Sequence, residues 1–288
     1  MTANFWCKMI QSDVDAAYDN MAHVPGSASL PAAWSAKATA FRFAHPKLIK
    51  ELPYGPKPRQ RMDVFHPEGA PVGLVVFVHG GYWMRLDKSF WSHLSEGALA
   101  HGWAVAIPSY TLTPEVRISH ITAEIGIAIE AAASLVPGPV RLVGHSAGGH
   151  LVTRMICSSS PLGKTVAQRV AKVVSISGLH DLRPLLSARM NETLGLDLAE
   201  AVTESPVLLR PGNDAKVSAW YGAAELPSFA HQADALLRAW DGSDAQVAVR
   251  SCASANHFSI LESFAGVEGE VLADLLDLTG SKPSYSVA

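Results

Sequence analysis

The chain has 288 residues, 48% of them hydrophobic, and a formal net charge of −3 from 23 basic and 26 acidic residues. This length and composition can bury one substantial core, so we expect a single domain over residues 1–288. Neither sign of charge gathers in long runs, which argues against binding to nucleic acid or to an anionic membrane surface.

We expect residues 1–60 to form a helical and irregular segment that differs from the core in its secondary structure. Residues 11–44 have a helical but irregular pattern that Pro25 and Pro31 interrupt, and residues 51–61 form a proline-rich stretch that predicts a loop. We expect this segment to lie near the active site of the core that follows.

Apolar strands and amphipathic helices alternate through residues 61–288. The residues of 72–79 are apolar at nearly every position, as in a strand covered on both faces. The predicted strands are 62–67, 72–79, 103–110, 140–146, 171–178, 215–222 and 245–251, and the predicted helices include 89–102, 116–135, 147–159 and 258–278. This alternation predicts a mostly parallel central sheet with helices on both faces, and ligands then bind outside the carboxyl ends of the strands.

A GxSxG pentapeptide, Gly144 to Gly148, stands between a predicted strand and a predicted helix. That context is the one required for a nucleophile elbow, in which a sharp turn exposes the serine hydroxyl above the sheet. Ser146 is therefore the candidate nucleophile. The two flanking glycines are expected because strand and helix come too close there for a side chain.

The sequence HGGYW leaves an earlier strand through two glycines and then two aromatic residues. Such a turn can supply backbone N–H groups that stabilise an oxyanion, and loss of one such donor costs about 3–4 kcal/mol. We expect the donors to be Gly81, Tyr82 and Ala147, with Gly80 shaping the turn; a register of Gly80 and Gly81 is the alternative. Tyr82 and Trp83 either line the acyl pocket or pack in the core.

The base and the acid of a serine hydrolase follow the nucleophile along the chain on this fold. Of the 12 histidines, only His231 and His257 come late enough, and His257 lies in a loop after a strand whereas His231 lies within a predicted helix. For the acid, Glu225 follows the strand 215–222, and Asp181 is its rival because it also follows a strand end. Asp214 precedes that strand and so lies at the wrong end of the sheet.

These motifs together resemble those of the α/β-hydrolase kynurenine formamidases, and more distantly the hormone-sensitive-lipase-like esterases. HGGYW, YTLTPE, GHSAGGHL, SGLHDLRPL, YGAAELPSFAHQ and NHFSILE occur in this order between about residues 74 and 262. The resemblance implies an α/β-hydrolase fold with Ser146 as nucleophile, His257 as base and Glu225 as acid. Many related enzymes carry Asp at the acid position, so Glu225 is a departure.

The resemblance also implies the reaction. The expected substrate is an aryl formamide such as N-formylkynurenine, or a small acyl amide or ester. The N-terminal segment is expected to cover the site, and Gly80, Trp83 and Trp34 are candidates for contacts with the substrate. A short-chain carboxylesterase and a catalytically inactive hydrolase fold that serves as a binding protein are the alternatives.

The sequence gives few signs of further partners. No HExxH or similar ligand pattern occurs, so we expect neither a metal nor another cofactor. Cys7, Cys157 and Cys252 are far apart and favour reduced thiols, and neither a signal peptide nor a stretch of about 18 uncharged apolar residues is evident. We expect a soluble, cytoplasmic protein with no membrane partner, and a homodimer is compatible with the sequence.

Overall fold

The computed structural model describes most of the chain. Cys7 lies outside the described residues, whereas Cys157 and Cys252 are both free thiols. The described ranges are 10–212, 214, 216–243 and 245–278.

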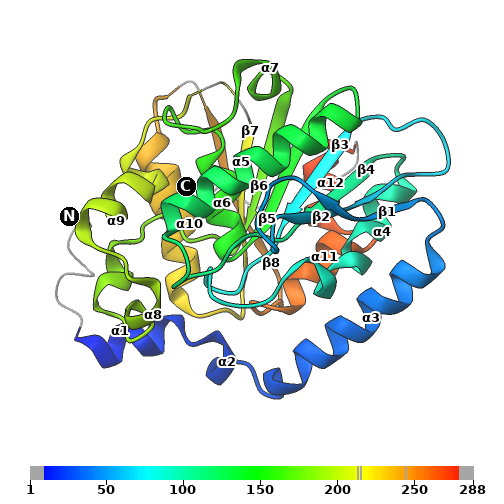
Figure 1. The fold of residues 1–288 in the computed structure, drawn as a ribbon. Coiled ribbons are helices and arrows are strands. Elements are labelled where there is room, and N and C mark those ends of the chain that lie inside the picture. Colours follow the sequence, from blue (N-terminus) through cyan, green and yellow to red (C-terminus); the bar gives the residue numbers. More distant parts are fainter. Residues whose placement is uncertain (1–9, 213, 215, 244, 279–288) are drawn as a thin grey trace.

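Eight strands form one twisted sheet at the centre of the molecule (Figure 1). The strand order is β1-β2-β4-β3-β5-β6-β7-β8; β1 and β2 run antiparallel to their neighbours, and the other pairs are parallel. The strands are β1 (Leu48–Pro53), β2 (Arg61–Phe65), β3 (Leu74–Val78), β4 (Ala104–Pro108), β5 (Val140–His145), β6 (Val170–Ile176), β7 (Lys216–Gly222) and β8 (Gln246–Cys252). The predicted mostly parallel sheet is thereby confirmed.

Helices cover both faces of this sheet. The helices are α1 (Gln11–Tyr18), α2 (Asn20–His23), α3 (Leu30–Ala44), α4 (Glu96–Ala100), α5 (Ile118–Leu135), α6 (Ala147–Arg154), α7 (Lys164–Ala167), α8 (Asn191–Leu194), α9 (Leu198–Glu204), α10 (Pro227–Trp240), α11 (Glu262–Ala265) and α12 (Glu270–Leu276). One apolar core forms between the sheet and α5, α6 and α10, and a second between the sheet and α3, α4, α11 and α12.

The position of strand β3 between two apolar cores explains why its sequence is continuously apolar. Leu74, Val76 and Val78 point into the core beside α5 and α6, whereas Val75 and Phe77 point into the core on the opposite face. All five residues are buried. A strand with helices on both faces needs apolar residues at every position, not only at alternate ones.

Three predicted elements differ from the observed ones. The predicted loop 51–61 begins inside a strand, because β1 runs to Pro53. The predicted helix 89–102 is two short 3₁₀ turns followed by α4, and the predicted helix 258–278 breaks between α11 and α12. Between α11 and α12, a Cβ on Gly269 would stand 2.0 Å from the Ser263 carbonyl oxygen, so the chain folds back too tightly for a continuous helix.

By length and composition alone, one described helix is apolar enough to cross a membrane, which we did not expect from the sequence. This helix is α5, and 56% of its apolar window is buried inside the molecule. Its inward side chains belong to the core beneath the sheet, including Ile121, Ile125 and Ile129. We therefore interpret α5 as a core helix.

Candidate active site

Ser146 lies in a sharp turn between β5 and α6. Its backbone is strained, with φ of 56° and ψ of −118°, a region that non-glycine residues rarely adopt. The neighbouring glycines show how tight the turn is: a Cβ on Gly144 would stand 2.1 Å from the Gly148 carbonyl oxygen, and one on Gly148 would stand 1.9 Å from that of Val78. The close approach expected from the sequence is therefore present.

Glu225 and His257 form a buried pair beside this turn. His257 Nδ1 lies 2.8 Å from Glu225 Oε2, and the two side chains are only 3% and 1% exposed. The second carboxylate oxygen, Oε1, accepts hydrogen bonds from the Ser177 hydroxyl and the Gly222 N–H, each at 2.6 Å. Because a carboxylate only accepts hydrogen bonds, this contact places the His257 proton on Nδ1.

The other candidates for acid and base lie elsewhere. The Asp181 carboxylate binds the Arg183 guanidinium, with contacts of 2.9 and 2.7 Å. His231 is exposed on α10, and Asp214 is exposed in the loop before β7. The structure thus brings Glu225, and not Asp181, into contact with His257.

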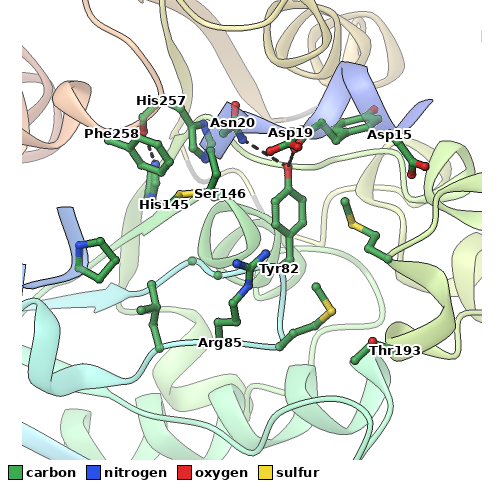
Figure 2. A pocket seen from close by; sticks show the side chains of 18 of the residues that line it. Asp15, Asp19, Asn20, Tyr82, Arg85, His145, Ser146, Thr193, His257 and Phe258 are labelled. Atoms are coloured by element: carbon green, nitrogen blue, oxygen red, sulfur yellow. Dashed lines mark hydrogen bonds between the residues drawn. The ribbon is translucent and has the colours of Figure 1, made fainter. Parts of the chain in front are cut away.

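Ser146 and His257 line the same cavity, which has a volume of about 640 Å³. Figure 2 shows both side chains on one side of this pocket, next to His145 and Phe258. His145 Nε2 lies 2.7 Å from the His257 carbonyl oxygen and donates to it. Burial lowers the pKa of His145 well below its usual value, so this neutral ring holds the His257 backbone without adding charge. In the part of the chain that the structure describes, no hydrogen bond joins Ser146 directly to His257.

The HGGYW turn lies directly against the serine. A Cβ on Gly80 would stand 2.9 Å from Ser146 Cβ, so only glycine fits. Gly81 and Tyr82 adopt positive φ angles of 106° and 51°, and both line the pocket. Within the described residues, the N–H groups of Gly81, Tyr82 and Ala147 donate to no other residue, which leaves them available to an oxygen bound beside Ser146.

Of the three aromatic residues predicted near the substrate, two line the pocket and one does not. Tyr82 lines the pocket, and so does Trp34, which packs against Trp91 and Phe258 with ring centroids 4.9 and 5.6 Å away. Trp83 is completely buried in the core beside α6, and it is not among the residues that line the pocket. For Trp83 the burial favours the alternative of core packing over the predicted contact with substrate.

Residues 11–23, here called the N-terminal strap, form one wall of the pocket. The Tyr82 hydroxyl donates to the Tyr18 carbonyl at 2.6 Å, and Asn20 Nδ2 donates to the same hydroxyl at 3.3 Å. In Figure 2 the strap passes directly above Tyr82. The strap residues that line the pocket are Asp15, Tyr18, Asp19, Asn20 and Met21.

Charged residues of the pocket were not found by sequence reasoning. Arg85, four residues after Gly81, lines the pocket and extends into it beside Tyr82 (Figure 2). Arg189 and Glu192, from the 182–194 region, also line it. No sequence pattern marked these residues, because their place in the pocket depends on tertiary contacts between distant segments. Among the residues that the structure describes, no cluster of three or more His, Cys, Asp or Glu side chains is suited to hold a metal ion.

Comparison with known proteins gives three results. The model of the "Alpha/beta hydrolase family" matches residues 75–279. The kynurenine formamidase of Danio rerio is 26% identical over 239 residues, which cover 79% of this chain and 80% of the relative. A similar match to the kynurenine formamidase of Drosophila melanogaster is 28% identical over 169 residues and covers 56% of each chain.

Two solved structures extend this comparison. A protein from Silicibacter sp. TM1040, provisionally described as a thioesterase, is 48% identical with a TM-score of 0.87, covering 92% of this chain and 99% of that one. Esterase B from Lactobacillus rhamnosis is 18% identical with a TM-score of 0.66, covering 92% and 95%. The second likeness concerns the fold alone.

Proposed function

We propose that this chain, which belongs to the alpha/beta hydrolase family, is a serine hydrolase that cleaves an aryl formamide such as N-formylkynurenine. The observation that carries the proposal is the 2.8 Å contact between His257 and Glu225 in a pocket that also holds the strained Ser146. Similarity to kynurenine formamidases of two animals supports the choice of substrate.

In the proposed mechanism, His257 Nε2 takes the proton of the Ser146 hydroxyl as Oγ attacks the formyl carbon. The carbonyl oxygen becomes an oxyanion and binds the N–H groups of the HGGYW turn and Ala147. His257 then returns the proton to the leaving nitrogen, and the C–N bond breaks to release the aryl amine. Water, deprotonated by His257, attacks the carbonyl carbon of the formyl ester. The C–O bond to Ser146 breaks, His257 returns the proton to Ser146 Oγ, and formate leaves.

Glu225 has an orienting role in this mechanism. It accepts a hydrogen bond from the Nδ1–H of His257, which keeps the proton on Nδ1 and leaves Nε2 as the basic nitrogen toward the serine. It also stabilises the imidazolium that forms after proton transfer. Its second oxygen is held by Ser177 and Gly222, which fixes the carboxylate in position.

The lining of the pocket suits an aromatic substrate with a charged end. Trp34, Trp91 and Phe258 form an aromatic wall against which an aryl ring can pack. Arg85 supplies a guanidinium group in the same pocket, and guanidinium groups pair well with carboxylates such as that of N-formylkynurenine. A simple short-chain ester makes no use of this charge.

The deciding measurement is kcat/KM for three substrates: N-formylkynurenine, 4-nitrophenyl acetate and a short acyl thioester. We expect formamide cleavage with release of formate, together with hydrolysis of the aryl ester, because an ester expels its alcohol more easily than an amide expels its amine. Turnover of the ester without the formamide favours the carboxylesterase alternative. Turnover of the thioester above both favours the activity suggested by the name of the 48% identical protein.

A fluorophosphonate probe separates these enzymes from an inactive binding protein. We expect labelling of the wild-type chain and none of Ser146→Ala. Failure to label the wild type would contradict the serine hydrolase proposal. The expected cytoplasmic location is part of this proposal, and cell fractionation tests it.

A further inference from the structure

The sequence YTLTPE has no role in the site described so far, yet it holds the HGGYW turn at two points. The Tyr110 hydroxyl lies 3.0 Å from the His79 carbonyl oxygen and 3.4 Å from that of Gly80. At the other end, the Thr113 N–H donates to the Trp83 carbonyl at 2.9 Å. Two motifs about 30 residues apart are therefore joined by hydrogen bonds.

Each carbonyl that is held in this turn fixes the N–H group across the same peptide bond. A trans peptide is planar, and its C=O and N–H point in opposite directions. Holding the Gly80 carbonyl therefore sets the direction of the Gly81 N–H. The Gly81 carbonyl accepts from the N–H groups of Met84 and Arg85, both at 3.0 Å, and this sets the direction of the Tyr82 N–H.

We propose that Tyr110 is a positioning residue for the oxyanion hole, whose hydroxyl acts with the His79 imidazole to orient the Gly81 N–H toward the reacting carbonyl. The inference rests on the proposed serine hydrolase function. His79 Nδ1 lies 2.7 Å from the Gly80 carbonyl oxygen and is its closer donor, whereas the single Tyr110 hydroxyl proton has its shorter contact, 3.0 Å, with the His79 carbonyl. Tyr110 and His79 thus hold the carbonyls of two consecutive peptide units.

The state of the two rings suits this role. Both are fully buried, and they stack with centroids 4.4 Å apart and an interplanar angle of 10°. Burial raises the pKa of Tyr110, so its hydroxyl remains a donor. Burial also lowers the pKa of His79 to about 4, so the neutral ring carries one N–H, which is on Nδ1. Packing keeps both donors in fixed positions, and fixed donors are what stabilisation of an oxyanion requires.

The test compares Tyr110→Phe with a matched control, Tyr54→Phe. Both changes remove one hydroxyl from a buried ring and one hydrogen bond to a backbone carbonyl, but Tyr54 donates to Ser109, outside the HGGYW turn. We expect Tyr110→Phe to lower kcat by about tenfold or more with KM nearly unchanged, because the N–H is misdirected and not removed. Affinity for a boronic acid, which forms a tetrahedral adduct on the serine, should fall by the same factor. Tyr54→Phe should lose a similar amount of stability and keep kcat.

A kcat within twofold of wild type in Tyr110→Phe, or equal losses in the two variants, would overturn the inference. If wild type itself shows no labelling of Ser146 by a fluorophosphonate, the proposed function falls and the inference falls with it; normal labelling with an unaffected Tyr110→Phe removes the inference alone.

A second pair of variants keeps the test decisive if Tyr110→Phe does not fold. His79→Asn retains an N–H donor near the position of Nδ1, whereas His79→Leu has a similar shape and no donor. We expect several-fold higher kcat in the Asn variant than in the Leu variant. Equal kcat values in two folded variants would count against the proposal.

Discussion

Glu225 uses both of its carboxylate oxygens, one on His257 and one on Ser177 and Gly222. The carboxylate is therefore held in the site by three hydrogen-bond donors. The extra methylene of Glu is accommodated because the residue lies only three positions beyond the end of β7 and its Oε1 accepts from the last N–H of that strand. Because the pair is buried, any residue that replaces Glu225 must also accept a hydrogen bond from the Ser177 hydroxyl.

Replacing Glu225 tests the acid directly. We expect Glu225→Gln to lower kcat for 4-nitrophenyl acetate by about 10³–10⁴-fold, because an amide nitrogen facing His257 favours the wrong tautomer of the ring. Asp181→Asn should retain kcat within about threefold, since it weakens a partly exposed pair with Arg183 that is worth roughly 0–1 kcal/mol. Thermal unfolding confirms that both variants fold. A larger loss in Asp181→Asn than in Glu225→Gln would reverse the assignment.

At the scale of single residues, sequence order placed the candidate reactive groups better than their surroundings. The chain order of nucleophile, acid and base singled out Ser146, Glu225 and His257, because each lies just after a strand whose end is known. Sequence favoured Glu225 but left Asp181 as its rival, since both follow strands. It also could not place Trp83 in the core or Arg85 in the pocket, because neighbouring residues of one turn point in directions that only the folded backbone sets.

Most strands were predicted from their apolar runs, whereas β1, at one edge of the sheet, was missed. β3, β4 and β6 are almost entirely buried, so continuous apolar runs marked them. β1 is an edge strand with mostly exposed residues, and its mixed sequence, which ends at a proline, predicted a loop. The break between α11 and α12 coincides with the close approach of Gly269 to the Ser263 carbonyl oxygen, a tertiary contact that the apolar pattern did not reveal.

The N-terminal strap is joined to the body of the molecule by a few hydrogen bonds that can be removed singly. The Tyr82 hydroxyl binds the strap through Tyr18 and Asn20, and the Ser228 hydroxyl of α10 donates to the Ala17 carbonyl. These contacts connect one wall of the pocket to the HGGYW turn and to the segment after Glu225.

Loosening the strap should weaken substrate binding. We expect the double variant Tyr82→Phe, Ser228→Ala to raise KM for N-formylkynurenine about fivefold to thirtyfold, because each lost hydrogen bond is worth about 1 kcal/mol, and to speed proteolysis of the N-terminal segment. Ser27→Ala is the matched control, since the Ser27 hydroxyl bonds to the Met21 carbonyl within the N-terminal region itself. If the double variant kept both its KM and its resistance to protease, the strap would not be a functional wall.

Across the whole molecule, several histidines are buried without charge. Burial lowers the pKa of His79 to about 4, that of His150 to about 3 and that of His180 to about 4. Each is fully buried and bonded through one ring nitrogen to a backbone carbonyl: Gly80, Glu204 and Gln232 respectively. Each ring is a neutral donor to a backbone carbonyl, and burial disfavours its protonated form.

This arrangement predicts that the stability of the protein falls at mildly acidic pH. In the unfolded chain a histidine binds a proton below about pH 6.5, whereas these three stay neutral in the folded chain until about pH 4. The unfolded state thus binds more protons. The contribution of these histidines to the free energy of unfolding is complete above pH 6.5 and decreases as pH falls from 6.5 toward 4. Each group contributes at most about 1.4 kcal/mol per pH unit, and the three together about 4.

Urea unfolding at pH 8.5, 7.5, 6.0 and 5.0 measures this dependence. We expect equal midpoints at the two higher pH values and a steep decline at the two lower ones. His180→Gln should be less stable at pH 7.5, because it loses contacts with Ser175 and Gln232, but its decline between pH 6.0 and 5.0 should be shallower, since one of the histidines whose pKa is lowered by burial is gone. A midpoint that stays constant from pH 7.5 to 5.0 would show that these histidines are not held neutral by the fold.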